Sequence, residues 1–272
     1  MGVASTQSIA MGQWSQCLAL AKQAAELAAK RLVTECAAGK VVRCDTDKDI
    51  KLEADFALDR ILVQSLSAHS AWPIVSEERV ETVGAISPNG YRWIIDPLDG
   101  SLNFARGIPF AAISIALWQG MTPLVGVVHD VSRAEVFSGI VGEGAWLNEQ
   151  PIHVSQVRAQ RHAVLCAGFP VREDFSTESL QAVVTGIQQY KKVRWLGSAA
   201  LSLAYVACGR ADVYQERQIA LWDVAAGVAI VQAAGGIVHL QAAPEGQAFL
   251  VTAGNPVLVE EAPRGCATTH ER

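Results

Sequence analysis

Two aspartates three positions apart form the most distinctive chemical pattern in the sequence. Asp96 and Asp99 lie in the run DPLDGSLNF, directly after the β-rich segment 91–95. Pro97 fixes its own φ angle and lacks a backbone donor, so the chain should leave the strand at a defined angle. Two carboxylates with a backbone carbonyl between them suit a hard cation that prefers oxygen. Two ordinary turns would explain either half of the run, but the whole run favours a metal-binding function.

The next two residues add groups that suit an anion. Gly100 and Ser101 offer backbone N–H groups and a hydroxyl. If a helix begins there, these groups form a site for a phosphate group. The run therefore combines ligands for a cation with donors for an anion.

Acidic residues in three other segments can be compared with this run. Glu77 and Glu78 follow a short predicted strand, Asp55 lies on a predicted amphipathic helix, and Asp223 begins a helix in WDVAAG. Taken alone, Glu77 and Glu78 could be a solvent-exposed pair and Asp55 an acid on a helix surface. Asp223 could simply cap the start of its helix. The small residues after Asp223 would nevertheless let its helix pack tightly and fix the carboxylate at the helix entrance.

The elements that must position these acids change character along the chain. The first half mixes helices with a meander of strands, and the second half alternates strands and helices, which predicts an α+β and α/β layered sandwich. We expect an N-terminal half at 1–155, a C-terminal half at 156–262 and a disordered tail at 263–272. Hydrophobic periodicity predicts helices at 11–38, 52–66, 177–190, 198–209 and 222–234. Strands are expected at 73–76, 91–95, 111–118, 124–129, 134–140, 145–147, 163–167, 192–195, 211–214, 237–240 and 249–251, with a loop at 81–90.

Composition limits the class of protein. Half of the 272 residues are hydrophobic, which is enough for a sizeable core, and the formal net charge of −5 argues against a nucleic-acid polymer as partner. No apolar run has the length of a membrane span. The cysteines lack CxxC spacing, so buried, reduced thiols in a cytoplasmic protein are expected at 17, 36, 44, 166, 208 and 266.

Two other kinds of site were weighed. Gly139, Gly142 and Gly144 do not have the dinucleotide-binding spacing and fit a hairpin better. Ser198 lacks the second glycine of a hydrolase nucleophile elbow. Nucleotide binding and serine hydrolysis are therefore poor alternatives.

The motifs together resemble the inositol monophosphatase family. DPLDGSLNF and WDVAAG occur in the family's order, and SEE, LEAD, GEGAWLN and LGSAALSLAYVACGRADVY fall where the family expects them. One departure is DIKLEAD at 49–55, where the family commonly has Val-Thr ahead of the helical aspartate. The resemblance implies a layered αβαβα sandwich of the sugar-phosphatase type and Mg²⁺-dependent hydrolysis of a phosphomonoester.

The resemblance also implies metal ligands. Glu77, Asp96 and the carbonyl of Leu98 would hold one Mg²⁺, and Asp96, Asp99 and Asp223 a second. A third, weaker ion near Glu77 is left open.

Roles for the remaining site residues follow from the same resemblance. Glu77 and the Ser101 hydroxyl would orient the attacking water, and Asp55 would accept a hydrogen bond behind Ser101. Phosphate would be bound at Asp99 and by the N–H groups of Gly100 and Ser101. Ser198 and Glu216 match positions that contact the hydroxyl-bearing part of the substrate.

The substrate remains open at this point. Inositol monophosphate or a similar polyol or sugar phosphate is the leading expectation, with fructose-1,6-bisphosphate as an alternative. A bisphosphate nucleotide is disfavoured because such relatives usually carry DGTKEF where this chain has DGSLNF. A non-catalytic member that binds phosphate or a protein would lack a metal carboxylate. The family further implies a homodimer and inhibition by lithium.

Overall fold

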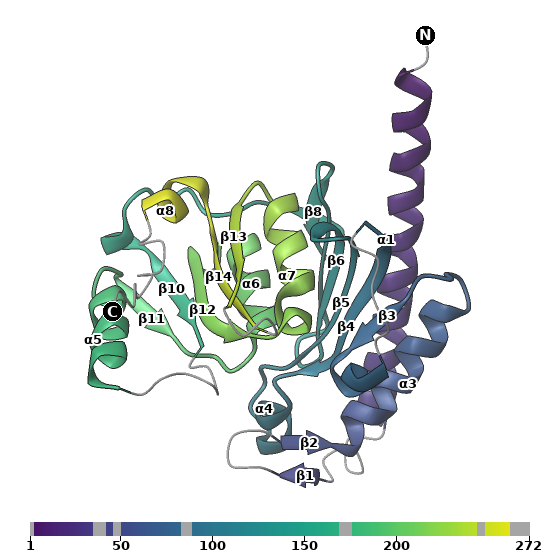
Figure 1. Ribbon diagram of the computed structural model, residues 1–272, viewed down its shortest axis with the longest axis horizontal. Coiled ribbons are helices and arrows are strands. Elements are labelled where there is room, and N and C mark those ends of the chain that lie inside the picture. Colours follow the sequence, from purple (N-terminus) through teal and green to yellow (C-terminus); the bar gives the residue numbers. More distant parts are fainter. Residues whose placement is uncertain are drawn as a thin grey trace, which may run out of the picture.

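The chain forms alternating layers of helices and sheets. The computed structural model describes residues 3–34, 42–45, 50–82, 89–168, 176–243 and 248–261. Two outer helices, a seven-stranded sheet, two central helices, a five-stranded sheet and two further helices follow one another across the molecule (Figure 1). This arrangement confirms the αβαβα sandwich expected from the sequence.

The seven-stranded sheet is a meander with one parallel pair. Its strands stand in chain order; β3 and β4 are parallel, and every later neighbouring pair is antiparallel. Nearly every residue of the central strands is buried, and neighbouring residues point to opposite faces. Apolar side chains therefore lie on both faces, as a sheet covered on both sides requires. The strands are β3 (Ile74–Ser76), β4 (Tyr91–Asp99), β5 (Ala112–Gln119), β6 (Thr122–Asp130), β7 (Glu135–Ile140), β8 (Gly144–Leu147) and β9 (Gln150–Ile152).

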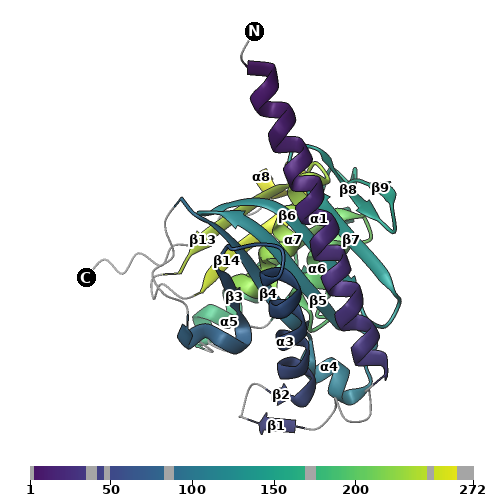
Figure 2. The same ribbon diagram turned by 90° about the vertical axis from the view of Figure 1, so that its right-hand side faces the viewer.

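Two amphipathic helices cover the outer face of this sheet. α1 (Val3–Thr34) lies across the strands, and α3 (Glu53–Ser67) lies beside it (Figure 2). The inward residues of both helices share one apolar core with the sheet, including Leu58, Leu62 and Trp93. A small hairpin of β1 (Val42–Asp45) and β2 (Ile50–Leu52) leads into α3.

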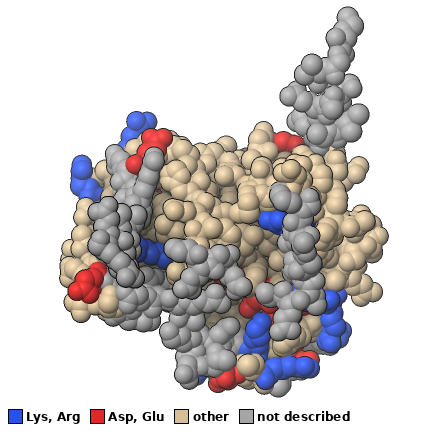
Figure 3. Space-filling model, in the orientation of Figure 1, with Lys and Arg blue, Asp and Glu red and all other residues tan. Residues whose placement is uncertain are grey.

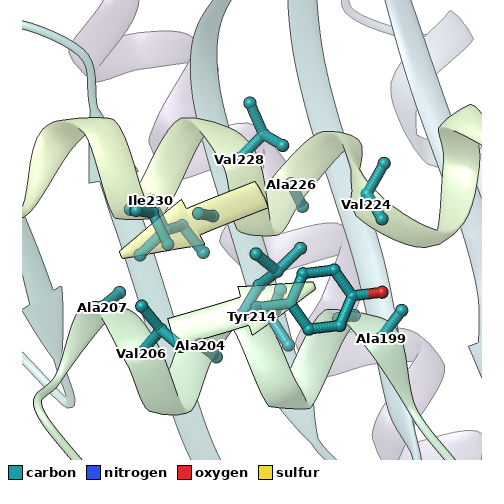
Figure 4. Packing of buried hydrophobic residues seen from close by; sticks show 14 of the residues in the cluster. Ala199, Ala204, Val206, Ala207, Tyr214, Val224, Ala226, Val228 and Ile230 are labelled. Atoms are coloured by element: carbon teal, nitrogen blue, oxygen red, sulfur yellow. The ribbon is translucent and has the colours of Figure 1, made fainter. Parts of the chain in front are cut away.

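Two helices of small residues fill the space between the sheets. α6 (Ala199–Ala207) and α7 (Leu221–Ala233) are buried on nearly every side, as expected of helices that are apolar all round. Figure 4 shows alanine and valine side chains of both helices, with the ring of Tyr214 between the two helices in this view. A Cβ at Gly227 would lie 2.4 Å from Cβ of Leu203, so the close approach of these helices requires glycine there.

The second sheet joins parallel and antiparallel strands. Its order is β11-β10-β12-β14-β13, with β10 parallel to both of its neighbours. The remaining elements are β10 (Val164–Ala167), β11 (Lys192–Arg194), β12 (Val213–Ile219), β13 (Ile237–Ala242), β14 (Phe249–Gly254), α5 (Thr177–Ile187), α8 (Pro256–Glu261) and the short turns η1 (Glu77–Thr82) and η2 (Gln160–His162).

Several boundaries differ from those predicted. The first helix begins at Val3 rather than 11, and the predicted stretch 35–38 lies outside the described residues. β12 continues to Ile219 instead of stopping at 214. The strand expected to stop at 95 continues to Asp99, with an irregular register where Pro97 interrupts the ladder. The sequence patterns did not predict β1, β2, β9 and α8. The tail at 263–272 lies outside the described residues.

The described cysteines are free thiols, but they are not all buried. Cys17 and Cys166 are buried, whereas Cys44 is exposed on β1, a strand whose four residues are all exposed. The expectation of burial was therefore wrong for Cys44, and Cys208 is only partly buried. Cys36 and Cys266 lie outside the described residues. In the part of the chain that the structure describes, no helix has the length and apolarity needed to cross a bilayer.

Candidate active site

Three carboxylates from distant parts of the chain converge. Glu77 begins η1, Asp96 lies on β4 and Asp223 is in the first turn of α7, yet one oxygen from each lies within 4.8 Å of the others. Asp96 is 1% exposed, and its Oδ1 accepts a hydrogen bond from the Leu98 N–H at 2.9 Å. The fold thus brings three of the four predicted metal-binding acids into one cluster.

Electrostatics make this cluster unfavourable without a cation. Burial raises the pKa of the Asp96 carboxyl well above its ordinary value, and the nearby charges, that of Glu77 first, raise it further. Burial likewise raises the pKa of Asp223, followed by the charge of Asp99. Crowded carboxylate oxygens are the donor set that Mg²⁺ prefers. The residues therefore fit a divalent magnesium site.

Asp99 stands beside this cluster rather than within the set of three. Its Oδ2 accepts hydrogen bonds from the Ser198 hydroxyl at 2.5 Å and the Ala200 N–H at 2.8 Å. Burial raises the pKa of Asp99 to about 6, although the Ser198 bond lowers it. Ser198 also caps α6, since its Oγ accepts from the Leu201 N–H at 3.2 Å. The start of α6 therefore fixes the position of Asp99.

Ser101 connects the metal motif to α3. Its Oγ lies 2.9 Å from Asp55 Oδ1 and 2.8 Å from the Leu98 carbonyl, and its single proton can go to one of them at a time. Asp55 Oδ2 accepts the Leu52 N–H at 2.5 Å, an acid at the third helical position bonding back to the helix start. Burial raises the pKa of Asp55 to about 6. The structure thus brings Asp55 and Ser101 together.

Gly100 makes the turn between β4 and the short helix α4 (Ser101–Arg106). Its φ of 85° is left-handed, a conformation that glycine adopts without strain. A Cβ there would lie 2.9 Å from the Phe110 carbonyl oxygen and 3.1 Å from that of Gly197. Glycine is therefore needed both for conformation and for space.

Glu216 lies on β12 and is partly buried. Its Oε2 accepts the Tyr214 hydroxyl at 2.7 Å, and burial raises its pKa to about 7. A Cβ on Gly168 would lie 2.0 Å from the Glu216 carboxylate. The absence of a side chain at Gly168 is what allows Glu216 to occupy this position.

The sequence did not predict three contributors to the site, of which Asp59 on α3 is the first. Ser76 Oγ and Arg79 Nε, on either side of the Glu77-Glu78 pair, donate to Asp59 on α3, each at 2.6 Å. Because Asp59 is buried, these bonds hold the acidic segment against the helix. The sequence signal was Ser76 itself, in the segment SEE.

The other two contributors are Asn103 and Lys51. Asn103 Nδ2 donates to the carbonyls of Phe110 and Leu196, both at 2.8 Å, and so joins α4 to the loop before α6. Lys51 Nζ lies 2.8 Å from Glu78 Oε1 and 3.6 Å from Glu77 Oε1. Asn103 was visible within DPLDGSLNF, whereas the pairing of Lys51 depends on tertiary structure.

A layered sandwich with a partly buried acidic cluster beside a Gly-Ser turn is what a metal-dependent phosphatase requires. Comparison with known families agrees, because a model described as the inositol monophosphatase family matches residues 13–270. The chain belongs to the inositol monophosphatase family and is a phosphoric monoester hydrolase. Members of this family generally depend on Mg²⁺.

Individual relatives carry two kinds of name. "Nus factor SuhB" of Xylella fastidiosa is 40% identical over 193 residues, covering 70% of this chain and 68% of the relative. "Inositol monophosphatase" of Mesembryanthemum crystallinum is 35% identical over 220 residues, which cover 77% of this chain and 80% of the relative. Among solved structures, the extragenic suppressor protein suhB of Bartonella henselae superposes with a TM-score of 0.80 at 32% identity. The superposition covers 91% of this chain and 96% of the suhB chain.

Proposed function

We propose that this enzyme hydrolyses inositol monophosphate or a similar small polyol or sugar phosphate, using two Mg²⁺ ions. The convergence of Glu77, Asp96 and Asp223 carries the proposal, because three acids from separate elements, one buried and two partly buried, need a cation to lie so close. Asp99 and the Leu98 carbonyl complete the proposed ligand set. Bound Mg²⁺ lowers the pKa of a coordinated water and neutralises phosphate charge.

The residues of the chain would then position the reactants. Glu77 and the Ser101 hydroxyl orient the attacking water, and Asp55 holds that hydroxyl. The N–H groups of Gly100 and Ser101 bind phosphate oxygens. In phosphoryl transfer, such positioning and charge neutralisation supply most of the catalysis.

The surface is compatible with a small substrate. Figure 3 shows acidic and basic side chains intermixed along the lower edge, around α3, α4 and β1, with no broad basic surface among the described residues of this face. A nucleic-acid polymer would require such a surface. We further place the enzyme in the cytoplasm as a homodimer, which sedimentation equilibrium would test as a molecular mass twice that of the chain.

Phosphate release from a panel of metabolites tests the proposal. The panel should include inositol monophosphates, sugar phosphates, fructose-1,6-bisphosphate and adenosine 3′,5′-bisphosphate, each with and without millimolar Mg²⁺. We expect Mg²⁺-dependent release from the polyol or sugar monophosphates and inhibition by millimolar lithium. If turnover is highest on one of the two bisphosphates, that bisphosphate and not a monophosphate is the substrate.

A second candidate role comes from the relatives' names. The Xylella fastidiosa relative is called a Nus factor, which suggests a binding role that need not involve catalysis. Folded protein that binds Mg²⁺ but releases phosphate from no phosphomonoester would favour that role. Detectable turnover in the panel would show that the site is catalytic, whatever else the protein binds.

Replacing Gly168 by alanine should weaken substrate binding more than turnover. The new Cβ would overlap the Glu216 carboxylate, which must move away from the proposed contact with substrate hydroxyls. Loss of a hydrogen bond to a charged group corresponds to a rise in KM of roughly 10- to 100-fold, with kcat little changed.

Gly186→Ala on α5 is the matched control for this variant. A Cβ there would meet nothing within 4 Å, so KM should be unchanged. Equal KM values for wild type and Gly168→Ala, while Glu216→Gln raises KM, would contradict the steric argument. Equal KM values in wild type, Gly168→Ala and Glu216→Gln would show that Glu216 does not contact the substrate.

A further inference from the structure

The backbone turn at Gly100 rests against the segment 109–111, which leads into β5. A Cβ on Gly100 would lie 2.9 Å from the Phe110 carbonyl oxygen and 3.4 Å from Cα of Ala111. The same Phe110 carbonyl accepts a hydrogen bond at 2.8 Å from Nδ2 of Asn103, a residue of α4. The position of segment 109–111 therefore limits where the Gly100 turn and the start of α4 can lie.

A guanidinium in the turn between β6 and β7 holds this segment. Nη1 of Arg133 donates to the Pro109 carbonyl oxygen at 2.9 Å and to Asp130 Oδ2 at 3.0 Å. Asp130 is buried, and its Oδ1 accepts the N–H groups of Ser132 and Arg133 at 2.8 and 2.9 Å. Because one buried carboxylate fixes both the turn and the guanidinium, Arg133 offers the Pro109 carbonyl a charge-assisted donor in a fixed place.

Two further contacts hold the segment at its other residues. The Val131 N–H donates to the Ala111 carbonyl oxygen at 3.2 Å. The Phe110 ring meets the ring of Tyr205 on α6 edge-on, with the two centroids 5.4 Å apart. Loss of the Arg133 side chain would therefore release the segment at Pro109 and leave it attached at the next two residues.

We propose that Arg133 is a positioning residue of the phosphatase. By binding the Pro109 carbonyl, it keeps segment 109–111 in place behind the turn that presents the Gly100 and Ser101 N–H groups and the Ser101 hydroxyl. The proposal rests on the proposed function, because it takes this turn as the phosphate site. An arginine with a structural role alone would contribute to stability and leave the catalytic constants unchanged.

Arg133→Met tests this role in the phosphate-release assay, at a temperature where all the proteins compared are folded. We expect kcat/KM to fall about tenfold, less than the roughly hundredfold effect of a 1 Å misplacement, because Val131 and Tyr205 still hold the segment. Arg133→Lys keeps a charged donor and should recover part of the loss. The rise in melting temperature on adding Mg²⁺ should be the same in both variants as in wild type, since the clustered acids lie on other elements.

Arg210→Met is the matched control for loss of a partly exposed, paired arginine. Arg210 donates through both terminal nitrogens to Glu135 at 2.6 Å, and its exposure is similar to that of Arg133. Its loss should lower the melting temperature without changing kcat/KM, because its hydrogen bonds go to Glu135 and not to segment 109–111.

The double variant Arg133→Met/Gly100→Ala tests the route through the Phe110 carbonyl. The alanine Cβ collides with that oxygen, and releasing Pro109 lets the oxygen move away. The double variant should therefore lose about a hundredfold in kcat/KM, no more than Gly100→Ala alone, because the two changes act on one shared backbone shift. Independent effects would multiply to about a thousandfold.

Three results would overturn the role of Arg133. These are an unchanged kcat/KM in Arg133→Met, a loss that Arg210→Met reproduces in full, and a thousandfold loss in the double variant. Wild type that releases phosphate from no metabolite of the panel would refute the proposed function itself, and the role of Arg133 with it.

Discussion

Asp96→Asn should lower turnover by roughly a thousandfold or more in the phosphate-release assay, while the protein remains folded. Asp96 is the central acid of the cluster, 1% exposed and within 4.8 Å of oxygens of Glu77 and Asp223. In the proposed site it contacts both ions, so one substitution weakens both. Three orders of magnitude correspond to about 4 kcal/mol, within the several kcal/mol that metal ions contribute to such reactions.

The same substitution should change stability in the opposite direction when metal is absent. Without a cation, neighbouring carboxylates repel the buried Asp96 charge. Asparagine keeps the shape and removes the repulsion, so Asp96→Asn should melt at a higher temperature than wild type in EDTA. Mg²⁺ at a hundred times its Kd stabilises wild type by about 2.7 kcal/mol, and this gain should be largely lost in the variant.

Asp130→Asn is the control for loss of a buried acid. Asp130 is 0% exposed, but it pairs with Arg133 at 3.0 Å outside the acidic cluster. Its substitution should lower the melting temperature both in EDTA and in Mg²⁺ while preserving the Mg²⁺-dependent shift. Near-normal turnover in Asp96→Asn, or an Mg²⁺-dependent shift equal to that of wild type, would show that Asp96 holds no metal.

Local patterns were sufficient to predict the layers of this fold. The amphipathic period of α3 and the all-apolar small residues of α6 and α7 follow directly from which faces are buried. The acids of the cluster were visible because proline, glycine and small residues around them restrict the backbone. The resemblance to known motifs then related acids that are up to 146 positions apart, Glu77 and Asp223, which no local pattern does.

What the sequence did not predict depends on tertiary contacts. β2 and β9 have three residues each, too few for an alternating pattern to stand out. The start of α1 is rich in serine and threonine, so its helical period is weak before residue 11. Lys51 reads as a solvated lysine until the fold brings it to Glu78, 27 positions away.

The end of β4 illustrates how a correct motif can still give a wrong boundary. Pro97 predicted that the strand would stop at residue 95, because proline cannot donate to the ladder. The strand instead absorbs proline as an irregularity in register and pairs again at Asp99 with Ala112. This irregularity leaves both aspartates at the C-terminal end of β4, where the metal centre is proposed.

Gly100→Ala should reduce kcat/KM by about a hundredfold, because misplacing reacting groups by roughly 1 Å has effects of that size. Gly100 lies between Asp99 and Ser101, and a Cβ would meet two backbone carbonyl oxygens at 2.9 and 3.1 Å. Backbone cannot move aside as a flexible side chain does, so the turn itself must shift. The left-handed φ of 85° adds about 1–2 kcal/mol of strain for alanine.

Gly235→Ala is the control that separates the steric overlap of the new Cβ from the strain of a left-handed φ. Gly235 also has a φ of 85°, but a Cβ there would meet nothing within 4 Å. Both variants should therefore lose similar stability from the left-handed conformation, as measured by urea unfolding, and Gly100→Ala should lose more because of the collision. Only Gly100→Ala should lose activity, since only its turn lies between a proposed metal ligand and the proposed water-orienting hydroxyl. Equal activity in the two alanine variants would mean that the tight approach at Gly100 serves packing and not catalysis.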